Sequence, residues 1–473
     1  MGKEKLFRTM ESYRSGDVPW QGGRAWGYVY DAGAEVSEVG KQAYAMFLSE
    51  NGLDPTQFPS LLRFENDLVG MAAAHLGGGE RVAGNFTSGG TESILLAVKT
   101  ARDHARAERP EVHEPEMVLP VTAHAAFHKA AHYLGVKVVP VPVDAETFKA
   151  DPAAVAEAVT DQTILLVGSA PSYAHGVMDP IEELGRIALE RGLLLHVDAC
   201  IGGFLLPYFR RLGAEVPPFD LSVPGVTSIS MDLHKYAYAP KGASLVLYRD
   251  KELRKHQIFS CSTWSGYSVV NPTVQSSKSG GPLAAAWAVL HFVGDDGYLE
   301  IARGLLDASR ALVEGIGAID GLRILGRPEM SLIAFTADDV GVFHIVDEMS
   351  SRGWYVQAQL AYGDSPENIH LTVAPSNTPW VDELLIDLRA SVETAKALAS
   401  SELASVVRNA FSSVDPATMG PEVLSQMLGM AGITGVDLPD RMAEVNEVLN
   451  ALPSALSERL LSEFINELFT AAP

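Results

Sequence analysis

The chain contains very little cysteine: only Cys200 and Cys261 occur among its 473 residues. They provide neither a disulfide framework nor the ligand spacing of a zinc site, which is typical of a reducing compartment. The N-terminal M-G-K-E-K-L-F-R-T-M has no apolar signal-peptide core, and Leu6 stands where a myristoylation motif has Ser or Thr. No apolar run reaches membrane-spanning length. We therefore expect a cytoplasmic protein without a transmembrane anchor.

Positive charge is also scarce. The 36 Lys and Arg residues are outnumbered by 59 Asp and Glu residues, which gives a formal net charge of −23. This balance argues against a general nucleic-acid binder, because neutralising phosphates requires clustered basic side chains. Small anionic ligands are still compatible with it, because helix N-termini and a few lysines can bind one phosphate. Hydrophobic residues make up 47% of the chain, enough for sizeable cores, and the length suggests two or three domains.

Short apolar runs alternate with helical patterns through the middle of the chain. E-M-V-L-P-V (116–121), T-I-L-L-V-G-S (163–169) and G-L-L-L-H-V-D-A (192–199) have the composition of buried strands. Between them, 126–135 and 181–192 have helical spacing and end at glycine. Strands separated by helices predict an α/β fold with a mostly parallel sheet covered on both faces.

The pattern changes after the pair Gly280–Gly281. An Ala/Leu-rich helical stretch is followed by strand-like runs with helices between them, which is typical of a smaller α+β domain. The remaining residues have the pattern of amphipathic helices. The predicted divisions are an N-terminal segment (1–55), a large α/β domain (56–290), a small C-terminal α+β domain (291–400) and a helical C-terminal extension (401–473).

The segment T-S-G-G-T-E-S (87–93) precedes a helical pattern and has two possible roles. Its adjacent glycines allow close backbone approach to a ligand, and the free N–H groups of a helix that begins near Gly90 and Thr91 favour an anion. The same letters also describe an ordinary helix cap, in which Ser or Thr is followed by Glu. It is neither a dinucleotide-binding fingerprint nor a Walker loop.

Two further residues follow predicted strands. Asp198 ends G-L-L-L-H-V-D and is expected at the carboxyl edge of the sheet, where α/β proteins bind ligands. A buried carboxylate needs a cation or strong donor, although a structural aspartate capping the next turn is the alternative. His124 follows the strand at 116–121 and is expected at the same edge, although a lone histidine is more often structural.

Lys235 lies in S-M-D-L-H-K-Y-A-Y-A-P-K-G-A (230–243), directly after His234. A lysine taken alone is usually solvated, but a desolvated lysine can condense with a carbonyl. A phosphate-binding turn, a histidine, a strand-end aspartate and a D-x-H-K lysine together match one cofactor. Pyridoxal 5′-phosphate has a phosphate, a flat ring, a ring nitrogen that pairs with an anion, and an aldehyde that reacts with lysine.

These segments, together with A-H-A-A-F-H-K-A-A-H-Y-L-G and G-S-A-P-S-Y-A-H-G-V-M-D-P-I, resemble the group II decarboxylase superfamily of pyridoxal phosphate enzymes. Within it, the unbroken H-K-Y-A-Y-A-P-K-G is most similar to the sphingosine-1-phosphate lyase family, from about residue 20 to 390. The resemblance implies a fold-type I enzyme with a large mixed, mostly parallel sheet domain, a smaller α+β domain and a helical tail. It also implies a homodimer with shared active sites and a small-molecule amine substrate.

By the same resemblance, the predicted site residues take specific roles. Lys235 would condense with the cofactor aldehyde, Asp198 would pair with the ring nitrogen and His124 would stack on the ring. Gly90, Thr91, His234 and Ser277 would hold the cofactor phosphate, with Ser277 in the S-S-K-S-G-G loop lent to the partner. Tyr173 would act in catalysis. The positions that match the family's substrate side are Tyr30, Asn51, Asp54 and Lys241.

The implied reaction is retro-aldol cleavage of a phosphorylated sphingoid base to an aldehyde and phosphoethanolamine. The substrate side departs from the family pattern, because Asp54 replaces a histidine, Val269 a tyrosine and Lys278 an arginine. Leu428 also stands where the lyases tend to have tyrosine. These departures motivate an alternative, an L-amino-acid decarboxylase on the same scaffold. A second alternative is a non-catalytic binding subunit, against which the intact lysine, aspartate and histidine argue.

Overall fold

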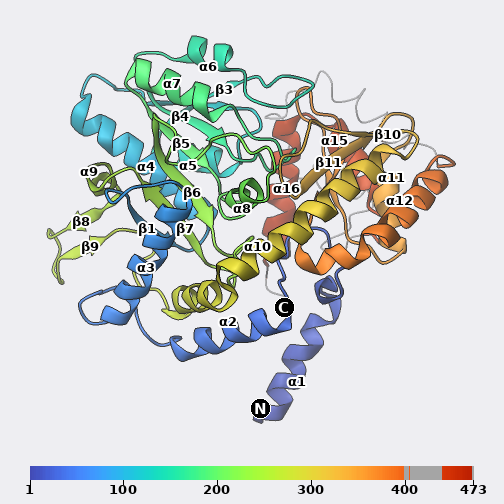
Figure 1. The fold of residues 1–473 in the computed structure, drawn as a ribbon, viewed down its shortest axis with the longest axis horizontal. Helices are drawn as coiled ribbons and strands as arrows, with labels where there is room; N and C mark the ends of the chain where they lie inside the picture. Colours follow the sequence, from blue (N-terminus) through green and yellow to red (C-terminus); the bar gives the residue numbers. More distant parts are fainter. Residues whose placement is uncertain (399–403, 405–438, 471–473) are drawn as a thin grey trace.

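The computed structural model describes residues 1–398, 404 and 439–470, and its large domain is built on a seven-stranded sheet (Figure 1). The strand order is β1-β7-β6-β5-β4-β2-β3. Strands β3, β2, β4, β5 and β6 are parallel, whereas β7 is antiparallel to β6 and β1. The strands are β1 (Ala83–Thr87), β2 (Glu116–Pro120), β3 (Lys137–Val141), β4 (Thr163–Ser169), β5 (Leu194–Asp198), β6 (Val226–Asp232) and β7 (Ser244–Tyr248).

Helices cover this sheet on both faces. Every residue of β2, β4 and β7 is buried, and successive strand residues point to opposite faces, so neither face of these strands is open to solvent. The helices of the N-terminal segment and large domain are α1 (Lys3–Tyr13), α2 (Ala34–Met46), α3 (Pro59–His75), α4 (Gly90–Glu108), α5 (Ala126–Leu134), α6 (Pro152–Ala158), α7 (Ile181–Arg191), α8 (Leu206–Arg211) and α9 (Lys251–Arg254).

Helix α10 (Gly281–Gly317) runs from the large domain to the small one and is interrupted at Gly294, which has φ 65°. The small domain contains a four-stranded sheet in the order β10-β11-β13-β12, with all neighbours antiparallel. Its elements are β10 (Leu322–Ile324), β11 (Leu332–Ala337), α11 (Val342–Ser351), β12 (Gln357–Gln359), β13 (Asn368–Thr372) and α12 (Val381–Ala395). A separate hairpin, β8 (Phe259–Cys261) and β9 (Val269–Asn271), projects from the large domain.

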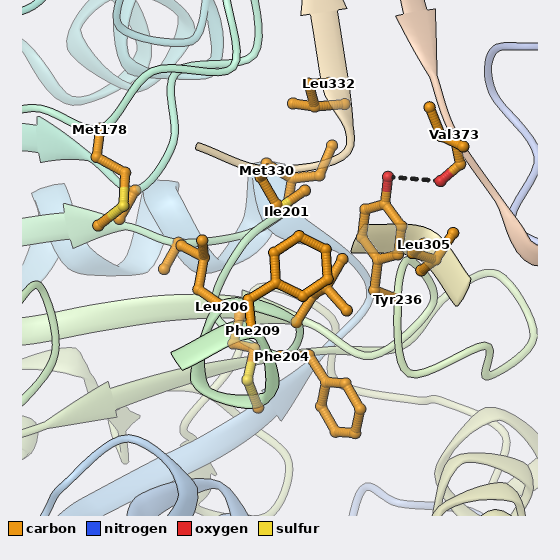
Figure 2. Packing of buried hydrophobic residues seen from close by; sticks show 14 of the residues in the cluster. Met178, Ile201, Phe204, Leu206, Phe209, Tyr236, Leu305, Met330, Leu332 and Val373 are labelled. Carbon is orange, nitrogen blue, oxygen red and sulfur yellow. Dashed lines mark hydrogen bonds between the residues drawn. The ribbon is translucent and has the colours of Figure 1, made fainter. Parts of the chain in front are cut away.

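Tyr236 joins the two domains through the buried core. Figure 2 shows its ring among apolar side chains of both domains, with the hydroxyl directed at Val373. The hydroxyl donates to the Val373 carbonyl at 3.0 Å and lies 3.3 Å from that of Ser331. Because Tyr236 directly follows Lys235, this buried contact fixes the lysine-bearing turn against the small domain.

The C-terminal extension contains α15 (Ala443–Ala451) and α16 (Ser454–Leu468) within its described part, and α15 docks on α11. The carboxylate of Asp347 accepts hydrogen bonds from the N–H groups of Met442 (2.9 Å) and Ala443 (3.0 Å), and so caps the start of α15. At the other end, Asn450 Oδ1 accepts from the N–H of Ala361 at 2.7 Å. The extension is thus anchored to the small domain at both ends of this helix.

The predicted fold class is confirmed: a large, mostly parallel α/β domain is followed by a smaller α+β domain and a helical extension. Sequence patterns did not predict the strands β1, β6, β7, β8, β9 and β12 or the helices α1, α6, α8 and α9. In the described part of the chain, no helix combines the length and apolarity needed to cross a bilayer.

Candidate active site

Seven of the predicted site residues lie at one edge of the large sheet. Asp198 ends β5 and Asp232 ends the neighbouring parallel strand β6, while α4 begins just after β1. Loops after β2 and β4 provide the other side chains. Together they line a cavity of about 420 Å³. Its predicted members are Gly90, Thr91, His124, Tyr173, Asp198, His234 and Lys235.

Lys235 is paired with a second carboxylate at the bottom of this cavity. Its Nζ lies 3.1 Å from Oδ2 of Asp232, which is only 2% exposed. Burial has the largest single effect and lowers the lysine pKa, but the acidic neighbours Asp232, Tyr30, Cys200 and Asp198 together outweigh it and raise the pKa. Oδ1 of Asp232 is buried and has no hydrogen-bond partner in the described part of the chain. The carboxylate therefore has spare acceptor capacity beside the reactive amine.

Asp198 is buried and held in a fixed orientation. Its Oδ1 accepts from the Cys200 N–H at 3.0 Å, and the Ser230 hydroxyl lies 3.3 Å from the same oxygen. Burial alone would raise the pKa of this carboxyl, but the charge of His124, hydrogen bonding from Cys200 and the charge of Lys235 hold it below its usual value. The side chain is thus an anion at neutral pH, as pairing with a protonated ring nitrogen requires.

The phosphate side of the cavity combines a helix N-terminus with His234. The first N–H groups of α4 have no carbonyl partner within the helix, so they favour an anion. His234 Nδ1 donates to the Ala243 carbonyl at 2.8 Å, which fixes the ring, and burial lowers its pKa. A Cβ at Gly90 would lie 2.8 Å from Cys200 Sγ and 2.9 Å from Asp232 Oδ2, so the cradle has no room for a larger residue.

Glu92 makes the capping contact that this segment predicts. Its carboxylate is buried and accepts from the Ser88 N–H at 2.6 Å, as a helix cap does. The other oxygen accepts from the Val274 N–H at 2.7 Å. Glu92 therefore orders the turn before α4 and ties it to the segment that leads to Ser277.

We expect Gly90→Ala to weaken binding of pyridoxal phosphate because the added methyl group would displace Cys200 or Asp232. Overpacking of this kind costs about 1–3 kcal/mol, or roughly 5- to 150-fold in cofactor Kd. Cofactor titration of the apoprotein measures it. Gly70→Ala on α3 is the control, since a Cβ there meets no atom within 4 Å. Wild-type affinity in Gly90→Ala would contradict the tight cradle.

His124 lies in the loop after β2 and lines the same cavity as Lys235. Its Nδ1 accepts from the Ala126 N–H at 3.1 Å, which orients the imidazole at the start of α5, and the residue is exposed. An exposed, oriented imidazole that lines the cavity can stack on a flat ligand. The anion site, the ring partner, the strand-end carboxylate and the lysine thus fit the separate parts of pyridoxal phosphate.

A second cavity of about 370 Å³ adjoins the first, and both are lined by Ser88 and Gly242. Lys241, Lys278 and Ser277 line only the second cavity. The ammonium of Lys241 lies 4.9 Å from the centre of the Tyr30 ring and donates to the Tyr28 carbonyl at 3.0 Å. Loss of water around it, with a smaller effect from the charge of Lys235, lowers its pKa to about 8.

The other predicted substrate residues lie outside the walls of both cavities. Tyr30 packs edge-on against Tyr236, 5.1 Å between ring centres, and burial raises its pKa. Asn51 Oδ1 accepts from the Leu53 N–H at 3.0 Å. Asp54 is exposed and caps its own turn by accepting from the N–H and hydroxyl of Thr56.

Two further departures from the family pattern are Val269 and Leu428, and Val269 lines neither cavity. Val269 begins strand β9 of the hairpin, whereas Leu428 lies outside the described residues. The cavity residues that were not predicted include Asp232, Cys200 and Glu92. Asp232 had a signal, since it is the aspartate of the D-x-H-K motif. Cys200 and Glu92 are placed by tertiary contacts that sequence spacing does not reveal.

Comparison with known proteins gives consistent matches. Residues 43–338 match the family model "Pyridoxal-dependent decarboxylase conserved domain", and residues 401–467 match "Pyridoxal-dependent enzyme, C-terminal putative HTH domain". The chain is 44% identical over 401 residues to sphingosine-1-phosphate lyase of Arabidopsis thaliana, covering 83% of this chain and 72% of that protein. It is 39% identical over 391 residues to sphingosine-1-phosphate lyase 1 of Rattus norvegicus, covering 82% and 68%.

Solved structures show the same relationship. A sphingosine-1-phosphate lyase of Burkholderia pseudomallei superposes with a TM-score of 0.80 at 38% identity, covering 84% of this chain and 91% of that one. A glutamate decarboxylase of Lactobacillus brevis has a TM-score of 0.74 at 21% identity, covering 84% and 94%, and thus shares the fold.

Proposed function

Because the chain belongs to the sphingosine-1-phosphate lyase family within the pyridoxal-dependent decarboxylases, we propose that it cleaves the C2–C3 bond of a phosphorylated sphingoid base. The products are a long-chain aldehyde and phosphoethanolamine. The observation that carries this function is the convergence of Lys235, Asp198 and His124 on one cavity beside the start of α4. The chain is a pyridoxal phosphate-dependent lyase by its family.

The residues of the cavity divide the binding of the cofactor among them. The start of α4 and His234 would hold the phosphate, His124 would cover the ring face and Asp198 would pair with the ring nitrogen. Pyridoxal phosphate, when bound, supplies an electron sink for the bond that breaks. Asp198 supports this chemistry because it is an anion at neutral pH, so it favours the protonated ring nitrogen.

The remaining polar residues act on protons and on orientation. Asp232 Oδ2 holds the proton-bearing Nζ of Lys235 at 3.1 Å, so this amine is kept at the floor of the cavity. The Tyr173 hydroxyl lies in the same wall and is available to orient a substrate hydroxyl. The substrate bond that is held perpendicular to the cofactor ring is the one that breaks. The side chains that orient the substrate therefore select between the lyase and the decarboxylase reaction.

Lys241 and Lys278 are assigned to the anionic end of the substrate. Both line the adjoining cavity, which joins the lysine-bearing site at Ser88 and Gly242. Asp54 carries the charge that would oppose a phosphate, but its carboxylate is engaged with Thr56. The replacement of a histidine by Asp54 thus removes a potential donor without placing a free anion on the wall of this cavity.

We expect substrate KM to rise as the pH increases through about 8, because Lys241 loses its positive charge above its pKa. Charged hydrogen bonds contribute about 1.5–3 kcal/mol, so the increase should be on the order of tenfold. KM measured across this pH range tests it. Lys241→Arg keeps its charge and should flatten the profile over the same range. An unchanged rise in Lys241→Arg would show that another group is responsible.

The active form is assigned as a homodimer. The β8–β9 hairpin exposes large apolar side chains that a monomer would leave in water: Phe259 is 55% exposed, Trp264 49% and Tyr267 63%. Sedimentation should give twice the mass of the 50.7 kDa chain. Trp264→Asp should shift the equilibrium toward monomer and reduce activity in parallel. A fully active monomer would contradict shared sites.

Product analysis separates the lyase from the decarboxylase. Holoenzyme is incubated with a phosphorylated sphingoid base and, separately, with a panel of L-amino acids. Aldehyde from the first substrate, without carbon dioxide from the second, is expected. Carbon dioxide with no aldehyde would support the decarboxylase. The sequence identities of 44% and 38% to sphingosine-1-phosphate lyases do not favour that outcome.

A further inference from the structure

Tyr173 is held in place by two contacts with His370 of the small domain. Its ring stacks on His370 of β13, with 4.4 Å between ring centres and 30° between planes. His370 Nε2 also donates to the Tyr173 carbonyl at 2.8 Å. These two contacts fix both the backbone and the ring of Tyr173. What they leave free is the direction of the hydroxyl proton.

Gln357 of β12 accepts this proton, and the side chain of Thr372 of β13 is a second hydrogen-bonding neighbour of the hydroxyl. The Tyr173 hydroxyl donates to Gln357 Oε1 at 2.6 Å, a short and therefore strong hydrogen bond. The other end of the same amide, Nε2, lies 3.5 Å from the Tyr28 hydroxyl. The Gln357 amide directs its oxygen at the Tyr173 hydroxyl and its NH2 group at the Tyr28 hydroxyl. Because an amide oxygen can only accept, Tyr173 must be the donor. The Tyr173 proton is thus directed away from the cavity.

We propose that Gln357 is a positioning residue that makes the Tyr173 oxygen a hydrogen-bond acceptor toward the C3 hydroxyl of the substrate. With its proton engaged by Gln357, the Tyr173 oxygen has only lone pairs to offer to a ligand. Burial raises the pKa of Tyr173, so the side chain remains a neutral phenol. The inference rests on the proposed function, because it is the substrate hydroxyl that Tyr173 orients. Gln357 itself lies outside the cavity wall.

The small domain would thereby contribute to substrate orientation without contacting the substrate. Gln357 is held in β12 by pairing with His370 in β13, so the residue that stacks on Tyr173 and the residue that binds its hydroxyl are register partners. A displacement of this sheet moves both contacts at once. The orientation of the Tyr173 hydroxyl therefore depends on how the two domains dock.

A double-mutant cycle between Gln357→Leu and Tyr173→Phe tests this on the full-length holoenzyme. Loss of one neutral hydrogen bond should lower kcat/KM of Gln357→Leu roughly three- to tenfold. Adding Gln357→Leu to Tyr173→Phe should cost nothing further, because the hydroxyl it directs is gone. Gln357→Glu, which retains an acceptor, should recover part of the loss. Gln359→Leu, two residues along the strand, is the matched control.

Two outcomes would overturn the inference. Wild-type kcat/KM in Gln357→Leu would show that the contact does not matter. An equal further loss in the Tyr173→Phe background would show that Gln357 acts through general structure. Inhibition by a substrate analogue lacking the C3 hydroxyl provides a second measure, since its inhibition constant should be the same in Gln357→Leu and wild type.

A readout independent of turnover keeps this inference separate from the proposed function. In 3-fluorotyrosine-labelled protein, the fluorine resonance lost in Tyr173→Phe identifies Tyr173. That resonance should shift in Gln357→Leu and stay in place in Gln359→Leu. If the wild type yields no aldehyde, the proposed function fails. The substrate-orienting role then fails with it, and the resonance shift still decides whether Gln357 sets the Tyr173 hydroxyl.

Discussion

Lys235→Ala is expected to reduce lyase activity at least about 10³-fold, the scale typical for loss of a residue that acts directly at the reacting centre. Lys235 lines the same cavity as Asp198, His124 and the start of α4. Alanine removes the amine that would condense with the cofactor aldehyde, and no other lysine of the described residues lines this cavity. It also leaves Asp232 buried without its cation, so cofactor affinity should fall as well.

Absorbance provides the direct measurement. Wild-type holoenzyme should show the visible band of lysine-bound cofactor, and this band should be lost in Lys235→Ala after dialysis. Lys251→Ala, at the exposed start of α9, is the control and should keep both band and activity. A wild-type protein that never takes up the cofactor would support a non-catalytic binding subunit. Persistence of the band in Lys235→Ala would assign the attachment to another lysine.

Asp198→Asn should lower kcat by roughly 10²–10³-fold while leaving the fold intact. The amide oxygen of Asn can still accept from the Cys200 N–H and the Ser230 hydroxyl, so the shape and these contacts persist. What disappears is the negative charge facing the ring nitrogen. Removing one partner of a buried ion pair costs about 3–5 kcal/mol, or roughly 150- to 5,000-fold in rate, and the expected loss lies in the lower part of this range.

Three measurements separate this electronic effect from a structural one. kcat and cofactor Kd should both change in Asp198→Asn, whereas the melting temperature of the apoprotein should stay near that of the wild type. Ser230→Ala removes one hydrogen-bond donor but no charge and should change kcat only a few-fold. Equal losses in the two variants would mean that orientation of the carboxylate, and not its charge, is what matters.

Much of the large domain could be predicted because its strands are buried on both faces. The runs at 163–169 and 192–199 are mostly apolar for this reason, and they correspond to β4 and β5. Strand β6 was not predicted: V-T-S-I-S-M-D has the alternation of a strand with one exposed face, whereas six of its seven residues are buried. Ser228 and Ser230 can be buried there because both hydroxyls contact ring nitrogens of His196. These contacts form between neighbouring strands, so the sequence of β6 alone does not reveal them.

The candidate site also contains residues that the sequence predicts and residues that it does not. Lys235, Asp198 and His124 were predicted because each follows a recognisable strand or motif, and parallel strand ends meet at one edge. Gln357 could not be predicted, because it is brought to Tyr173 by the pairing of β12 with β13 and by domain docking. The residues that hold the reactive groups in place are those that come from distant segments.

The strand order of the sheet has a consequence for how the protein folds. Strand β1 reaches β6 only through β7, so the start of α4 and Lys235 become neighbours after three distant segments have paired. Contacts between distant segments form late, because long loops must close first. We therefore expect pyridoxal phosphate to bind the native state in preference to the unfolded chain, and by mass action to protect the folded enzyme against unfolding.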